Sequence, residues 1–143
     1  MKTLINLIIT SILVLATMFA EATERPEPVK FFKAESIIDH YLDATQHGNT
    51  ELVDHLFTSD FYYSTPNNRS KESLNRKAMT TYLKSLKGVK LDCTSTYQFI
   101  EKNDDCSIVK VTTEFEKFKR NDYITLCNSK DGWKISNVIV TYP

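Results

Sequence analysis

The sequence has no excess of charge of either sign. Its 18 lysine and arginine residues balance 18 aspartate and glutamate residues. Proteins that bind nucleic acid or an anionic membrane surface do so through clusters of positive charge. The charge balance therefore predicts no nucleic-acid partner. It also predicts no membrane partner for the chain that remains after its N-terminal leader, described below, is removed.

Cysteine is scarce, and no C-x-x-C motif is present. The three residues are Cys93, Cys106 and Cys127. Their spacing lacks the paired ligands of a zinc site, and their odd number allows at most one internal disulfide. One bridge with one remaining thiol, or three half-buried thiols on strands, are both open. We expect no metal and no cofactor.

Repeats and low-complexity stretches are absent, and one long apolar run stands out, from Leu4 to Phe19. It follows Met1-Lys2 and ends in Ala20-Glu21-Ala22, a small-x-small cleavage pattern. The run is short for a spanning helix, and no stop-transfer cluster follows it. The pattern predicts a signal peptide over residues 1–22, with export to the periplasm or the cell exterior. Polar, proline-bearing residues 23–33 are expected to form an exposed N-terminal segment.

The first half of the remaining chain has apolar residues at helical spacing. We expect helices over residues 34–46, 50–57 and 73–86. An extended piece and a turn-rich loop separate the second helix from the third. The three helices are expected to pack through their apolar stripes.

The second half alternates as strands do. We expect strands over residues 89–102, 106–119, 122–128 and 133–142. A turn at 103–105, a "KRN" corner at 119–121 and the turn "SKDG" at 129–132 would join them antiparallel. Helices followed by strands predict an α+β domain over residues 34–143, with helices gathered on one face of a curved sheet.

Two stretches carry a family resemblance: "IIDHYLDATQHGNTELVDHLFTSDFYYSTP" near the start of the domain and "DYITLCNSKDGWKISNVIV" at its end. Together they resemble the nuclear transport factor 2-like (NTF2-like) superfamily, and most of all its branch described as "putative lumazine-binding". The resemblance implies a cone: three N-terminal helices packed on a curved, mainly antiparallel sheet, with a pocket at the open end. Fold alone does not give function here.

The ketosteroid isomerase branch of the superfamily is an enzyme whose catalytic residues can be compared with this sequence. That chemistry needs a carboxylate base, and a tyrosine with a protonated acid as an oxyanion clamp. The tyrosine matches Tyr41. The base position falls on Thr65, and near the clamp's acid position stand Ile124 and Thr125. Two roles are vacant, so no catalytic residue is assigned.

Three polar residues of the first helix are spaced for a metal site: His40, Asp43 and His47. At 100° per residue they centre almost opposite the helix's apolar stripe. We expect them to face solvent and to hold no metal.

Aromatic and hydroxyl side chains are the candidates for lining the cone. The set is Tyr41, Phe61, Tyr63, Thr65, Tyr82, Phe115 and Trp133. Such a cleft suits a small apolar or aromatic ligand; alternatively, these side chains simply fill the cone.

The leading interpretation is an exported ligand-binding or interaction protein. One alternative is a lyase- or isomerase-like enzyme acting on a small cyclic substrate in the cone. Another is an assembly module without ligand, since family members commonly form homodimers through the outer sheet face. The residues expected on that outer face are Ile108, Phe118, Ile124 and Leu126.

Overall fold

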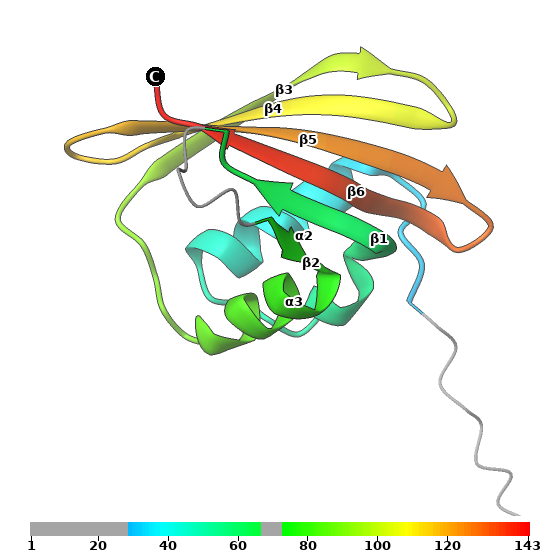
Figure 1. The fold of residues 1–143 in the computed structure, drawn as a ribbon, viewed down its shortest axis with the longest axis horizontal. Helices are drawn as coiled ribbons and strands as arrows, with labels where there is room; N and C mark the ends of the chain where they lie inside the picture. Colours follow the sequence, from blue (N-terminus) through cyan, green and yellow to red (C-terminus); the bar gives the residue numbers. More distant parts are fainter. Residues whose placement is uncertain (1–28, 67–72) are drawn as a thin grey trace, which may run out of the picture.

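The computed structural model describes residues 29–66 and 73–143, in which a twisted sheet covers two helices (Figure 1). The predicted signal peptide, residues 23–28 and the loop residues 67–72 lie outside the described residues. Neither described helix combines the length and apolarity that a membrane crossing requires.

The sheet has six strands in the order β2-β1-β6-β5-β4-β3. They are β1 (Phe57–Ser64), β2 (Leu74–Asn75), β3 (Thr94–Lys102), β4 (Cys106–Glu114), β5 (Lys119–Ser129) and β6 (Gly132–Thr141). Strands β3 to β6 form an antiparallel meander, whereas β1 pairs parallel with β6. The predicted α+β class and mainly antiparallel sheet are confirmed.

The helices number two rather than the predicted three in the described residues: α2 (Ala34–Gln46) and α3 (Arg76–Ser85). The expected helix over 50–57 is only a 3-10 turn, η2 (Val53–His55). The end of that segment joins the sheet instead of a helix. Phe57 pairs with Ile135, and the Ile135 amide donates to the Leu56 carbonyl at 2.8 Å. A short apolar run is ambiguous between helix and strand, and here tertiary pairing decided the outcome.

Helix α3 begins later than predicted, at Arg76 instead of Ser73. Leu74 and Asn75 pair with β1 as the short strand β2. The Asn75 side chain then accepts a hydrogen bond from the Ala78 amide at 3.0 Å, which caps the helix.

The core lies between α2 and the concave face of the sheet. Helix α2 buries Ile37, Ile38 and Tyr41 completely, as its 3-4 apolar spacing predicted. The concave strand residues opposite them are Val109, Val111, Ile124, Leu126, Ile135, Val138 and Val140. Met79 and Leu83 attach α3 to the same core.

Strand β5 begins at Lys119, so the predicted "KRN" corner at 119–121 is wrong. The turn lies earlier, where the Phe115 amide donates to the Phe118 carbonyl at 2.9 Å. Because side chains on one strand face recur every second residue, this start places Arg120 and Asp122 on the same concave face as Ile124. Arg120 and Asp122 belong to the candidate site described below.

The closing hairpin matches its prediction. Ser129 pairs with Gly132, whose φ of 82° supplies the left-handed turn expected of "SKDG". A Cβ at Gly132 would stand 2.6 Å from the Phe31 carbonyl oxygen, which accepts a hydrogen bond from the Trp133 amide. Phe31 itself is only 6% exposed, so the predicted exposed segment 23–33 is wrong at this residue.

The predicted outer-face set also needs correction. Ile124 and Leu126 are fully buried in the core, because they alternate with the convex-face residues Tyr123, Thr125 and Cys127 of β5. Ile108, which alternates with buried Ser107 and Val109, does lie on the convex side. Phe118 lies in the β4–β5 turn and is 50% exposed.

Candidate functional site

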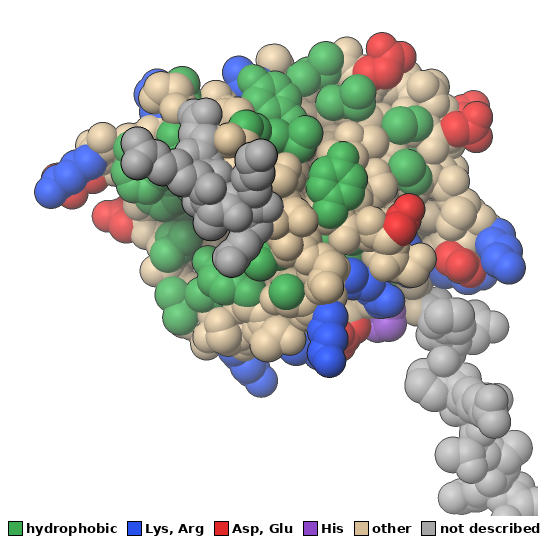
Figure 2. Space-filling view, viewed as in Figure 1, with side chains coloured by type: hydrophobic (Ala, Val, Ile, Leu, Met, Phe, Trp, Pro, Cys, Tyr) green, Lys and Arg blue, Asp and Glu red, His purple; other side chains and the backbone are tan. Residues whose placement is uncertain are grey.

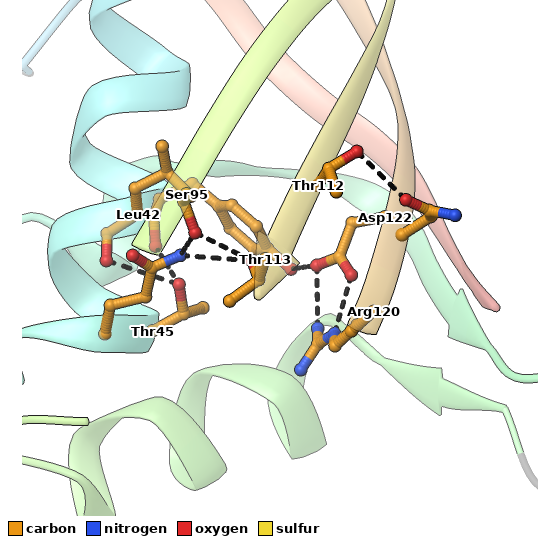
Figure 3. Close-up of polar contacts among 10 residues, drawn as sticks. Leu42, Thr45, Ser95, Thr112, Thr113, Arg120 and Asp122 are labelled. Carbon is orange, nitrogen blue, oxygen red and sulfur yellow. Dashed lines mark hydrogen bonds and ion pairs between the residues drawn. The ribbon is translucent and has the colours of Figure 1, made fainter. Parts of the chain in front are cut away.

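Three side chains form an ionic network where α2 meets the beginning of β5. The Arg120 guanidinium donates from Nε to Asp122 Oδ1 at 2.6 Å and from Nη2 to Asp122 Oδ2 at 2.7 Å (Figure 3). The Tyr41 hydroxyl, from the buried stripe of α2, donates to Asp122 Oδ2 at 3.0 Å. Asp122 is thus the acceptor in all three bonds, and the fork-like arginine contact is the strong, bidentate kind. We call these residues the Arg120–Asp122–Tyr41 network.

Burial governs the electrostatics of this network. The Asp122 side chain is 6% exposed, the Arg120 side chain 24%, and Tyr41 is fully buried. Burial, reinforced by the Asp122 charge, raises the pKa of Tyr41 well above its ordinary value of 10.0. Burial alone would lower the pKa of Arg120, but Tyr41 and Asp122 raise it by more, and the guanidinium stays charged.

Tyr63, from β1, borders the network across β6. Tyr63 pairs with Val138 of β6, and Val138 pairs on its other side with Ile124 of β5, two residues from Asp122. Burial raises the pKa of the Tyr63 hydroxyl; Arg120 acts to lower it and Asp122 to raise it. Tyr63 is therefore a neutral hydroxyl within the field of the ion pair.

A second polar group lies beside the network, where α2 ends. Gln46 Nε2 donates to Ser95 Oγ at 2.6 Å, and the Ser95 and Thr113 hydroxyls lie 2.8 Å apart. Gln46 is 7% exposed and Thr113 is 5% exposed. Figure 3 shows Ser95 and Thr113 facing the helix, whereas Thr112 points to the other side of its strand. Hydrogen-bonding side chains therefore gather at this end of the cone.

A cavity of about 20 Å³ lies among these side chains. Its lining residues are Leu42, Thr45, Gln46, Leu91, Thr113, Phe115, Arg120 and Asp122. This volume is enough for about one water molecule. The cone is filled by side chains in this conformation.

An aromatic cluster adjoins that cavity through Phe115, which lines it. Phe115 stacks on Phe118 with ring centroids 4.5 Å apart, and Phe118 meets Tyr142 at 6.1 Å. Phe118 and Tyr142 are each 50% exposed. We call Phe115, Phe118 and Tyr142 the aromatic rim. On the face shown in Figure 2, by contrast, positive and negative side chains lie interspersed around the periphery.

The structure brings three of the predicted pocket residues together. Tyr41 and Tyr63 contribute hydroxyls to the polar end, and Phe115 lines the small cavity beside Asp122. Thr65, half-buried, follows Tyr63 at the end of β1.

The other three predicted residues lie apart. Phe61 is buried against Phe57, with ring centroids 4.4 Å apart, in the apolar interior. Tyr82 is 52% exposed, and α3 buries Met79 and Leu83 instead, so Tyr82 does not line the cone. Trp133 pairs with Asn128, six residues or about 20 Å along β5 from Asp122.

Sequence reasoning missed Arg120 and Asp122. The prediction that the clamp's acid position is vacant is wrong. The penultimate strand does present a carboxyl group to Tyr41, two residues before Ile124 and on the same face. Arg120 was missed because residues 119–121 were treated as a corner, and Asp122 was missed because the acid position was assigned near Ile124 and Thr125. A usable signal was present, because an arginine and an aspartate two apart on a strand share one face.

The histidine cluster of α2 is divided in the structure. His47 Nδ1 lies 3.1 Å from Asp43 Oδ1, with both side chains largely exposed. His40 instead packs against Phe31, with ring centroids 5.3 Å apart. Within residues 29–66 and 73–143, no group of three potential metal ligands occurs.

Comparison with known structures places the fold. An NTF2-like protein of unknown function from Silicibacter pomeroyi is similar, with a TM-score of 0.61, 14% identity and coverage of 76% of this chain and 92% of that one. A ketosteroid isomerase-like protein from Erwinia carotovora atroseptica gives a TM-score of 0.58, 14% identity and coverage of 76% and 92%. At such identities the likeness shows the fold. Among curated protein sequences, none matches.

Comparison with family sequence models is more specific. The model described as "Putative lumazine-binding" matches residues 30–139, which is most of the chain. The chain therefore belongs to this family, and its fold is NTF2-like.

Proposed function

We propose that this protein is exported and binds a small planar ligand at the polar end of the cone. The observation that carries the proposal is the Arg120–Asp122–Tyr41 network. A charged pair with one member 6% exposed and the other 24% exposed is costly to desolvate. Well-packed apolar residues of similar volume often replace such a pair without loss of stability. Charges kept at such a position suit recognition of a ligand.

The donor set suggests the chemistry of that ligand. A guanidinium has five N–H donors, and Asp122 engages two of them. Among the described residues, no hydrogen bond is made by Nη1. That group can therefore donate to a carbonyl or acidic oxygen placed at the mouth of the cavity. Lumazine, the ligand in the family's description, is a flat heteroaromatic dione. It offers such oxygens together with a ring.

The aromatic rim suits the ring of the same ligand. Half-exposed Phe118 and Tyr142 offer apolar faces next to Phe115, which lines the cavity. Aromatic rings favour offset-stacked or edge-to-face contacts with one another. Because the cavity is only about 20 Å³, binding requires the rim to move outward, and the ligand then replaces contacts between rim residues.

A binding role fits the network better than an isomerase-type clamp does. That clamp requires a protonated acid that donates to the substrate. Asp122 instead accepts from Arg120 and Tyr41, and the Tyr41 hydroxyl already donates to it. Neither group is left as a free proton donor, so we propose binding rather than catalysis.

The test is isothermal titration of the purified protein with lumazine. We expect a Kd on the order of 10 µM. Arg120→Met should weaken binding about ten- to hundred-fold, because it removes a charged hydrogen-bond donor. Lys119→Met is the matched control: it removes the neighbouring positive charge, whose side chain is 59% exposed, and should bind as the wild type does. Equal affinity of both variants, or no heat with any protein, would contradict the proposal.

Export has its own test. The signal-peptide pattern supports cleavage after Ala22. Expression of the full chain in a Gram-negative host, followed by fractionation and N-terminal sequencing, should give a periplasmic protein that starts at Thr23. A cytoplasmic product that retains Met1 would rule out this part of the proposal.

A further inference from the structure

Cys106 and Cys127 face each other directly across β4 and β5. They are register partners, and the flanking Asn128 amide donates to the Asp105 carbonyl at 2.9 Å. This bond identifies Cys106 and Cys127 as a non-hydrogen-bonded antiparallel pair, in which opposite Cα atoms lie about 4.5 Å apart and side chains approach closely. Disulfides span Cα separations of about 4.4–6.8 Å. A bridge therefore fits this pair without backbone movement.

The third cysteine is out of reach of both. Cys93 immediately precedes β3, whose first residue, Thr94, pairs with Glu114 at the far end of β4. Glu114 lies eight positions from Cys106 along extended β4, a distance of about 26 Å. Of the three possible pairings, the fold allows one.

Both paired thiols lie on the convex face, away from the core. Cys106 alternates with buried Ser107, and Cys127 with buried Leu126, while the cysteines are half-buried and free. Burial, followed by the influence of Cys127, raises the pKa of the Cys106 thiol. Reaction with an external disulfide should therefore accelerate as the pH rises above neutrality.

We propose that Cys106 and Cys127 form a reversible cross-strand disulfide, with Cys93 left as the remaining thiol. The oxidant is a low-molecular-weight disulfide. One protein thiolate attacks it, forming a mixed disulfide and releasing one small thiol. The second cysteine then attacks the protein sulfur of that mixed disulfide and releases the other small thiol. Two protein thiols are oxidised, and one small disulfide is reduced to two thiols.

The bridge joins the strands at the end of β5 away from Asp122. It closes a loop of 20 intervening residues, from 107 to 126. Closing such a loop restricts the unfolded chain, so the oxidised protein should melt about 5–10 °C higher than the reduced one. The proposal is independent of ligand binding, which involves the opposite end of the strand.

The experiment is thiol counting with peptide mapping. Reduced protein is equilibrated with oxidised glutathione, quenched with iodoacetamide and digested with trypsin without reduction. We expect one alkylated cysteine, Cys93, and a linked pair of peptides, 103–110 and 121–130. Three alkylated cysteines, or any bridge that includes Cys93, would overturn the proposal.

Two variants sharpen the result. Cys93→Ser should still form the linked pair and leave no alkylated cysteine. Cys106→Ser removes the partner thiol, so a glutathione adduct should persist on Cys127 in place of the bridge. In the Cys93→Ser protein, a stable glutathione adduct on Cys106 or Cys127 without linkage would show that the two sulfurs do not meet, and would likewise overturn the proposal.

Discussion

The concave side of β5 changes character between two successive inward-facing residues. Ile124 and Leu126 are fully buried among aliphatic side chains, while Asp122 and Arg120 form an ion pair on the same face. Both parts belong to one strand, and Tyr41 of α2 donates a hydrogen bond to Asp122 of the second part. We call them the apolar end and the polar end of the cone.

The difference shows which part of the chain is explained by folding. The apolar end gains stability from burial, at roughly 25 cal/mol per Å² of apolar surface. The polar end buries charge, which costs desolvation free energy and is recovered only by good pairing. Folding alone thus accounts for the apolar end, whereas the polar end suits a ligand.

The largest effect should come from placing a charge at the apolar end. Ile124→Asp puts a carboxylate into the core without an arginine to pair with it. We expect a loss of about 4 kcal/mol or more in the free energy of unfolding, measured by urea denaturation. Thr125→Asp is the control, since its side chain lies on the convex face; it should cost about 1 kcal/mol or less. Equal losses would show that the two faces of β5 are wrongly assigned.

Breaking the ion pair should have the next largest effect. Arg120→Met leaves the Asp122 carboxylate buried without its cation, at a cost of about 3 kcal/mol. The double variant Arg120→Met/Asp122→Leu should regain most of that loss, because an apolar pair can replace a buried ion pair. It should nevertheless fail to bind lumazine. A double variant no more stable than Arg120→Met would mean that the pair is needed for the fold itself.

Tyr41→Phe should have a smaller effect, about 1–2 kcal/mol, because Asp122 keeps its two bonds to arginine. The variant should also change the response to alkali. The pKa of Tyr41 is raised above 10.0 in the folded state, so it contributes stability that is present below pH 10 and is lost as the pH rises toward the folded-state value. Between about pH 9 and pH 11, the variant's free energy of unfolding should fall less steeply than the wild type's. Identical slopes would contradict the buried position of the hydroxyl.

The smallest effect should come from the exposed pair next to the network. Lys119 Nζ lies 2.6 Å from Glu114 Oε1, but both side chains are more than half exposed. Lys119→Met should change the free energy of unfolding by about 0.5 kcal/mol or less. A loss comparable to that of Arg120→Met would show that general charge balance, rather than burial, accounts for the stability of this hairpin.

The fold was largely predictable because its signals are local and periodic. The stripe of α2, the alternation along β4 and β6, and the Asp-Gly turn at Gly132 all appear as expected. The helix expected over 50–57 failed because Phe57 pairs with β6, about 80 positions later in the sequence, and no local pattern reports such pairing.

The site was less predictable, for a related reason. Tyr41 was identified, but its partner Asp122 lies 81 residues away, and no local pattern reports their contact. The predicted strand began three residues late, which left Arg120 in a supposed corner. Asp122 lay inside the predicted strand, but the acid position was assigned two to three residues further on, near Ile124 and Thr125. Strand boundaries are set by tertiary pairing, so charged residues near them are the ones most easily misplaced.

The most direct test of the difference between the two ends is an NMR titration of ¹⁵N-labelled protein with lumazine. Ligand binding at the polar end predicts saturable shifts of the Phe115, Arg120 and Asp122 amides, with the Leu126 and Trp133 amides little changed. Shifts centred on the apolar end or the convex face, or no saturable shifts, would contradict the account.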